Sequence, residues 1–174
     1  MKILIAYATR NGTTRECAEI LAGFLKNQDV TLIGIGKGGE SIPSIEDYDV
    51  VVFGSNVRMA KIDKTLSEYL RKNTDMLLGR HCAYFLCCGF TDCFEDYLYK
   101  NIPEELIESA ETVSCFGGSL EKSRAKGFDR LIISAVRSEI LGGGQNGQQR
   151  DDISLPTIMD MNISQFADTI LGRR

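Results

Sequence analysis

Residues Thr9–Thr14, with the sequence TRNGTT, place hydroxyl groups, an amide and a glycine between an apolar run and a helical pattern. Backbone N–H groups at the start of a helix have no intrahelical partners, and the helix dipole favours negative charge there. Gly12 allows a tight turn and a close approach of the backbone to a ligand. Four side chains can donate hydrogen bonds to phosphate oxygens, namely those of Thr9, Asn11, Thr13 and Thr14. The stretch therefore predicts a phosphate cradle, and the alternative is a polar turn in which Thr13 caps the helix.

Two other loops carry small and polar residues at predicted strand ends. The third apolar run ends in GSNVRM (54–59), and the fourth ends in CCGFTD (87–92). In a doubly wound sheet, ligands bind at the carboxyl edge of the strands, where the strand order reverses. The first loop lacks both the P-loop lysine and the glycine pattern of dinucleotide-binding proteins. The three loops together predict a mononucleotide site.

The elements that must position these loops can be read from the apolar pattern. Five short runs are almost continuously apolar, which is typical of strands covered on both faces of a parallel sheet. They lie at 3–8, 30–36, 50–54, 82–88 and 113–118. Helical stripes of apolar residues occupy 17–25, 62–70 and 163–171. This alternation predicts an α/β fold with a three-layer, doubly wound, five-stranded parallel sheet.

Several segments carry more local expectations. The connection 37–49 is expected to lack a crossover helix, and a helix is expected to start at PEEL (103–106). The last helix should begin at a cap formed by Asn162 or Ser164. The whole chain, 1–174, is interpreted as one domain with an inserted helical segment and a mobile loop at about 119–152. The apolar stripe at 128–140 is expected to pack on the domain, and the alternative is a docking surface.

The composition excludes several classes of function. The net charge of −4 disfavours bulk binding of nucleic acid. No apolar run approaches the roughly 20 residues of a membrane-spanning helix, and the first residues do not resemble a signal peptide. We therefore expect a cytoplasmic protein without a transmembrane segment, with peripheral attachment to a membrane left open. The cysteines are expected to be buried free thiols rather than disulfides. They are Cys17, Cys82, Cys87, Cys88, Cys93 and Cys115.

No metal site or set of catalytic residues can be assigned from the residue pattern. The cysteine spacing in CCGFTDC (87–93) matches none of the defined zinc or iron–sulfur ligand patterns. His81 is the only histidine, and a structural or surface role is expected for it. No Ser/His/Asp set and no pair of carboxylates can be assembled.

Three segments resemble a known family. The pattern T-x-N-G-x-T resembles the flavodoxin phosphate loop T/S-x-T-G-x-T, with Asn11 in place of the middle threonine. The stretches 9–18, 48–73 and 116–139 are similar, in order and spacing, to the flavodoxin-type, menaquinone-dependent protoporphyrinogen oxidase group. The resemblance implies FMN as cofactor, the strand order 2-1-3-4-5 and redox chemistry at the isoalloxazine ring.

Carried over residue by residue, the resemblance implies cofactor contacts from all three loops. The phosphate would be held by Thr9, Arg10, Asn11, Gly12, Thr13 and Thr14. The ribityl chain and the ring would lie beside Ser55, Asn56, Val57 and Arg58, with Met59 at the following turn. The other side of the ring and its pyrimidine edge would meet Cys88, Gly89, Phe90, Thr91 and Asp92.

The chain departs from small electron-carrying flavodoxins around the ring. Those proteins usually hold the flavin between aromatic side chains, often a tryptophan, but this chain has no tryptophan. Phe90 and Tyr97 remain as stacking partners, and Met59 with Arg58 occupies the corresponding turn. A nearby cation stabilises an anionic reduced ring by Coulomb attraction. We therefore hypothesise a flavin less reducing than that of a typical flavodoxin; the alternative is that Arg58 is an ordinary surface arginine.

Three functions remain open at this point. The first is an FMN enzyme that oxidises protoporphyrinogen IX or a similar substrate and passes electrons to a quinone. The second is a flavodoxin-type electron carrier between redox proteins. The third is a module that has lost FMN and serves in binding, which the intact TRNGTT loop disfavours. The expected partners are thus a quinone or a redox protein, together with a porphyrinogen substrate for the first function, and a homo-oligomer is left open.

Overall fold

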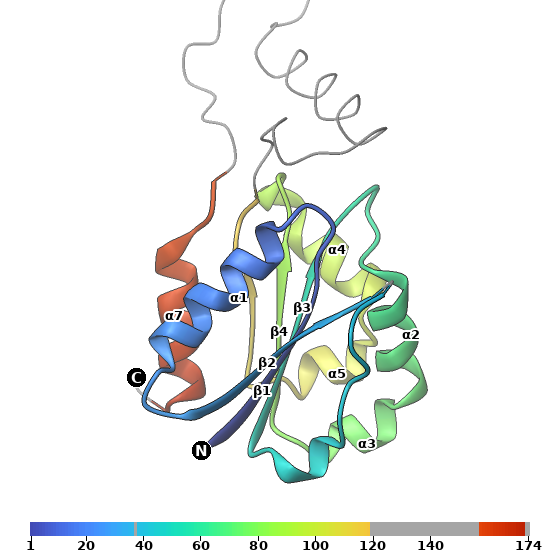
Figure 1. Cartoon of the computed structure of the whole chain (residues 1–174). Coiled ribbons are helices and arrows are strands. Elements are labelled where there is room, and N and C mark those ends of the chain that lie inside the picture. The colour runs from blue at the N-terminus through green and yellow to red at the C-terminus, as the bar shows by residue number, and fades with distance from the viewer. Residues whose placement is uncertain (37, 119–156, 173–174) are drawn as a thin grey trace, which may run out of the picture.

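A single parallel sheet forms the centre of the protein. The computed structural model describes residues 1–36, 38–118 and 157–172 (Figure 1). All the pairings between neighbouring strands are parallel, in the order β2-β1-β3-β4-β5. The strands are β1 (Lys2–Ala8), β2 (Asp29–Ile35), β3 (Val50–Asn56), β4 (Cys82–Cys87) and β5 (Thr112–Cys115). The predicted fold class and strand order are therefore confirmed.

Helices cover both faces of the sheet, as Figure 1 shows. One face carries α1 (Thr13–Phe24) and α7 (Asp160–Ile170), which lie side by side. The other face carries α2 (Lys64–Lys72), α3 (Thr74–Leu78), α4 (Phe94–Asn101) and α5 (Glu104–Glu108). Single 3-10 turns occur at Ile45–Asp47 and Thr91–Cys93. No helix in these described parts of the chain is long and apolar enough to cross a membrane.

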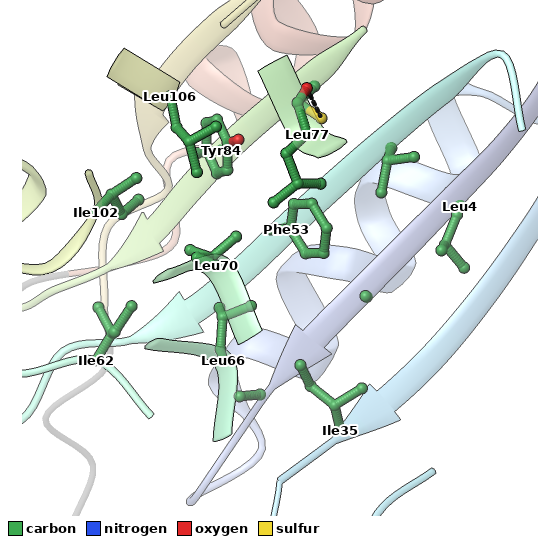
Figure 2. Packing of buried hydrophobic residues seen from close by; sticks show 14 of the residues in the cluster. Leu4, Ile35, Phe53, Ile62, Leu66, Leu70, Leu77, Tyr84, Ile102 and Leu106 are labelled. Atoms are coloured by element: carbon green, nitrogen blue, oxygen red, sulfur yellow. Dashed lines mark hydrogen bonds between the residues drawn. The ribbon is translucent and has the colours of Figure 1, made fainter. Parts of the chain in front are cut away.

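The core under α2–α5 is built from strand residues that point to one face of the sheet. Phe53 and Tyr84 stack with ring centroids 5.9 Å apart, and Leu66 and Leu70 of α2 close over them (Figure 2). Each of these side chains is at most 2% exposed. Burial of such a side chain contributes about 1.5–3 kcal/mol, so this packing holds α2 against β3 and β4.

The core under α1 and α7 is aromatic. Phe85 and Phe116 stack with centroids 4.3 Å apart, and Phe166 of α7 meets both rings edge-on. Gly54 makes room for this cluster, because a Cβ atom there would lie 2.0 Å from the Phe85 ring. A side chain at this position would displace Phe85, so the glycine belongs to the packing of the sheet.

The local expectations have mixed outcomes. The connection before β3 contains only the turn at Ile45–Asp47 within its described residues, as predicted, and α5 begins directly after Pro103. The predicted caps Asn162 and Ser164 are wrong, because α7 already begins at Asp160 and has no side-chain cap. The fifth strand is shorter than its apolar run, since Gly117 turns the chain with a φ of 75°. The predicted insertion and loop at 119–152, including the 128–140 stripe, lie outside the described residues.

Candidate functional site

The three predicted loops meet at the carboxyl edge of the sheet. The register pairs Ala8 with Ser55 and Asn56 with Cys87, so β1, β3 and β4 end next to one another. A hydrogen bond of 2.9 Å from the Val57 N–H to the Cys87 carbonyl continues the pairing beyond the strands. The phosphate-loop, 54–59 and 87–92 segments are therefore neighbours, as the strand order requires (Figure 1).

The turn between β1 and α1 is built around Gly12. This residue is the N-cap of α1 with a φ of 91°, a left-handed conformation that favours glycine. Its N–H donates to Thr9 Oγ1 over 3.1 Å, which closes the loop on itself. The alternative in which Thr13 caps the helix is wrong, because Thr13 is the first helical residue and no side chain caps α1. A Cβ atom on Gly12 would meet no described residue within 4 Å, so the described part of the chain leaves this turn open.

The hydroxyl groups at the start of α1 differ in their surroundings. Thr13 is 9% exposed and Thr14 is fully buried. Among the described residues, Thr14 Oγ1 has no hydrogen bond of ordinary geometry, although the Cys87 thiol is near enough that interaction with Thr14 lowers the pKa of that thiol. A buried hydroxyl without a partner costs roughly 1–3 kcal/mol. Arg10 is exposed and Asn11 is half-buried at the rim of the same turn.

The second loop is shaped by the fully buried Ser55. Its hydroxyl donates to the Asn56 carbonyl and accepts from the Asp63 N–H, both over 3.0 Å. Asp63 in turn accepts from the first-turn amides Thr65 N–H and Leu66 N–H and so caps α2. The predicted cofactor residue Ser55 thus uses its side chain to fold the loop between β3 and α2.

A tight hairpin, Arg58–Lys61, projects from this loop. The two end residues exchange backbone hydrogen bonds of 2.8 and 3.0 Å. The central residues Met59 and Ala60 have φ values of 50° and 59°, a conformation that costs a non-glycine residue roughly 1–2 kcal/mol. Met59 is 72% exposed, and its sulfur lies 3.9 Å from Nη1 of Arg58. The hairpin therefore carries an exposed apolar side chain and a cation at the edge of the site.

Asn101 holds this hairpin from α4. Its Oδ1 accepts from the Ile62 N–H over 3.1 Å, and its Nδ2 donates to the carbonyls of Ala60 and Tyr97 over 3.0 and 2.7 Å. The Asn101 side chain is 6% exposed, and its bond to the Ile62 N–H is buried while the other two are partly buried. The role of Asn101 was not predicted from the sequence. The pattern that could have indicated it is an amide side chain among the apolar positions of segment 92–110.

The third loop follows β4 and leads into α4. Cys88 is buried and its thiol lies 3.6 Å from the Phe90 carbonyl, while Gly89 is half-buried. Phe90 is 48% exposed, and Thr91 and Asp92 are exposed in the turn that follows. The predicted ring-side residues of this loop are therefore accessible, with the exception of Cys88.

The cysteines and the histidine do not form a metal site within the described residues. All six cysteines are free and five are buried, which confirms the expected thiols; Cys93 is half-buried. Among the described residues, no group of three or more His, Cys, Asp or Glu side chains is placed to hold a metal ion. His81 is exposed and contacts Glu111 through Nδ1 and Oε1. These two residues border an open hollow of about 820 Å³ at the amino edge of the sheet, opposite the three loops.

Comparison with known proteins agrees with this architecture. Residues 4–146 match the family described as flavodoxin domain. Protoporphyrinogen IX dehydrogenase (quinone) of Escherichia coli strain K12 is 32% identical over 157 residues, which cover 87% of this chain and 86% of that protein.

Two solved structures share the fold with a TM-score of 0.50 each. A Fusobacterium nucleatum flavodoxin bound to flavin mononucleotide is 13% identical and covers 98% of this chain and 97% of its own. A flavodoxin, WrbA-like protein from Agrobacterium tumefaciens is 12% identical and covers 99% of each chain. The sheet order, the family match over most of the chain and the 32% identical relative together show that this chain belongs to the flavodoxin domain family.

Proposed function

We propose that the chain binds FMN at the carboxyl edge of its sheet and uses the flavin to oxidise a porphyrinogen with a quinone as electron acceptor. The observation that carries the binding step is the open left-handed turn at Gly12 in front of α1. Membership of the flavodoxin domain family and the named activity of the 32% identical relative support the choice of cofactor and reaction.

The residues around Gly12 fit the phosphate end of such a cofactor. The first amides of α1 point out of the helix without intrahelical partners, and the helix dipole adds positive potential for a dianion. The described residues leave space beside the Gly12 backbone, where a Cβ atom would meet nothing within 4 Å, and a phosphate group could approach there. Thr14 contributes a buried hydroxyl that makes no hydrogen bond of ordinary geometry within the described part of the chain. Together these groups offer donors and space without a lysine.

The residues on the other two loops fit the ring end. Met59 and Phe90 are large, apolar and exposed, at 72% and 48%, on the loops that follow neighbouring strands. Exposed apolar side chains of this size gain from covering a flat aromatic ligand. Arg58 places positive charge beside Met59, where it would stabilise an anionic ring. Bound FMN supplies the two-electron redox chemistry, and the protein supplies binding, orientation and charge.

A second function, electron transfer between redox proteins, is favoured by the exposure of Met59 and Phe90. Both side chains stand at the rim of the proposed ring site, where a partner protein could reach the flavin edge. In this case the substrate would be another protein's redox centre, and the 58–61 hairpin would form part of the docking surface.

A visible spectrum tests the shared binding step. The full chain, purified and mixed with FMN, should retain a yellow flavin after gel filtration and quench its fluorescence. A protein that stays colourless and leaves the FMN fluorescence unchanged would contradict the proposal.

Anaerobic turnover then separates the two functions. The loaded protein should oxidise protoporphyrinogen IX when menadione is present, with the same concentration of free FMN and no protein as control. Rapid reduction by a ferredoxin reductase, together with a protoporphyrinogen rate no higher than that of the control, would replace the enzyme by the electron carrier.

A further inference from the structure

Two thiols that the flavin chemistry does not use lie in contact beside the site. The sulfur atoms of Cys88 and Cys115 are 3.3 Å apart. Cys115 ends β5 and pairs with Leu86 in the register, so Cys88 lies diagonally across from it just beyond β4. The backbones approach closely here, because a Cβ atom on Gly118 would come within 2.9 Å of the carbonyl carbon of Cys88. Strand register and a glycine therefore bring the two sulfurs together.

The surroundings make the two thiols chemically unequal. Either thiol can donate in the contact between Cys88 and Cys115; with Cys88 as the donor, Cys115 Sγ accepts from it and from the Gly117 N–H, the latter over 3.4 Å. These donors lower the pKa of Cys115 in spite of its burial. The pKa of Cys88 is raised, first by the hydrogen bond to Cys115 and then by burial. Cys115 is thus the thiol of the pair that ionises more readily, and Cys88 lies in contact with it, which is the arrangement of a nucleophile and a resolving group.

Two of the other buried cysteines, Cys87 and Cys82, are less suited to oxidation. Contact with Cys17 and burial raise the pKa of Cys87, which keeps that thiol protonated. Burial raises the pKa of Cys82 to about 11. Because the thiolate is the reactive form, oxidation should begin at Cys115 rather than at these residues.

We infer that Cys88 and Cys115 form a dithiol that a hydroperoxide oxidises reversibly to a disulfide. The Cys115 thiolate attacks one peroxide oxygen, the O–O bond breaks, and hydroxide leaves and takes up a proton as water. The resulting sulfenic acid on Cys115 is attacked by Cys88, which loses its proton as the S–O bond breaks and a second water leaves. The two sulfurs lose two electrons in total, and hydrogen peroxide is reduced to two waters.

The contact needs little rearrangement to close. A disulfide has a sulfur–sulfur distance of about 2.05 Å, so the thiols must approach by roughly 1.2 Å from their 3.3 Å contact. Closure would tie the beginning of the 88–92 loop to the end of β5. Hydrogen peroxide is small enough to reach thiols that are 3% and 7% exposed, whereas bulky thiol reagents should first modify the half-buried Cys93.

Peptide mapping of the full-length protein tests the pair directly. The reduced protein is treated with one equivalent of hydrogen peroxide, denatured, alkylated and digested with trypsin without reductant. Peptide 101–122 contains Cys115 as its only cysteine, whereas peptide 81–100 contains Cys82, Cys87, Cys88 and Cys93. We expect a disulfide between the two peptides that dithiothreitol reverses.

Variants identify the partner within peptide 81–100. Cys88→Ser should abolish the crosslink and leave a sulfenic acid on Cys115 that dimedone traps, whereas Cys87→Ser, the matched buried control, should retain the crosslink. Persistence of the crosslink in Cys88→Ser would overturn the inference. The inference would also be overturned if peroxide oxidised Cys93 in the wild-type protein while Cys115 remained reduced and fully alkylated. This outcome can be measured even if the variants do not fold.

The pH dependence of disulfide formation tests the thiolate. Reactivity rises with pH as a thiol ionises, and an ordinary thiol of pKa about 8.5 gains roughly 16-fold in thiolate between pH 7 and pH 8.5. Because its pKa is lowered, Cys115 should gain less than about 3-fold over this interval. A gain of about 3-fold or more would overturn its assignment as the nucleophile. None of these measurements requires FMN, so a protein that forms the disulfide but takes up no flavin contradicts the proposed function alone.

Discussion

Replacement of Asn101 by alanine should loosen the 58–61 hairpin and weaken flavin binding together. The amide makes three hydrogen bonds, to Ile62 N–H and to the carbonyls of Ala60 and Tyr97. At roughly 0.5–1.5 kcal/mol for each bond, their loss should lower the free energy of unfolding by about 2–4 kcal/mol. The Ala60 carbonyl belongs to a residue with a φ of 59°, so the variant also removes a contact that holds the strained turn in place.

Asn73 provides the matched control for this experiment. Its Nδ2 donates a hydrogen bond of 2.8 Å to the Tyr69 carbonyl at the end of α2, whereas the hairpin lies before the start of this helix. Asn73→Ala should therefore cost about 0.5–1.5 kcal/mol and leave the dissociation constant for FMN unchanged. Urea denaturation gives the free energies, and FMN fluorescence quenching gives the affinities.

The result that would refute this reasoning is specific. If Asn101→Ala costs no more than Asn73→Ala, the three hydrogen bonds do not stabilise the fold as their geometry indicates. If it lowers stability by several kcal/mol but binds FMN as tightly as the parent, the hairpin is not part of the flavin site. A loss of FMN affinity of about tenfold or more, without unfolding at 25 °C, is the outcome that we expect.

Three further substitutions test other parts of the site. Gly12→Ala should raise the dissociation constant for FMN at least about tenfold and lower the free energy of unfolding by about 1–2 kcal/mol. Gly172→Ala, the control at another open left-handed glycine, should lower the free energy of unfolding by a similar amount and leave FMN binding unchanged. Titration of FMN fluorescence measures the affinity, and denaturation measures the stability. Ala60→Gly should raise the free energy of unfolding by about 0.5–1 kcal/mol because it relieves the left-handed turn. The control Ala22→Gly, within α1, should lower the free energy of unfolding by about 1 kcal/mol. If both variants lower it equally, Ala60 is not strained in the parent protein. Arg58→Gln should lower the flavin midpoint potential in a redox titration, and an unchanged potential would remove Arg58 from the tuning of the ring.

Much of the sheet could be predicted from local sequence, because its strands are covered on both faces and read as continuous apolar runs. The order of the strands in the sheet could not be predicted in this way, because the residues of Lys2–Ala8 do not indicate which strands pair with it. The strand order was predicted from the family resemblance. The start of α7 was misplaced for a related reason. Asn162 resembles a cap, yet its amide donates over 2.8 Å to the carbonyl of Cys115, 47 residues away.

The phosphate side of the candidate site was more predictable than the ring side. The turn at Gly12 is determined by residues within one loop, so composition and spacing were sufficient to find it. The left-handed residues Met59 and Ala60 carry no such signal, because neither is a glycine or an asparagine. Their conformation depends on Asn101, 41 residues from Ala60, and the contact between Cys88 and Cys115 depends on strand register. Long-range packing therefore had to be seen before either could be inferred.

The separation of the candidate site into a phosphate end and a ring end has a thermodynamic consequence for a bound flavin. The midpoint potential depends on the difference in affinity between the oxidised and the reduced cofactor, by about 30 mV for each tenfold difference in a two-electron couple. The phosphate keeps its charge when the ring is reduced, so contacts made by Gly12 and the start of α1 contribute equally to both states and cancel. Contacts from Arg58 and Met59 do not cancel, because the ring is where the charge changes. Gly12→Ala should thus alter affinity without altering the potential, whereas Arg58→Gln should alter the potential through the affinity of the reduced state, and the reverse pattern would place the ring and the phosphate at exchanged ends of the site.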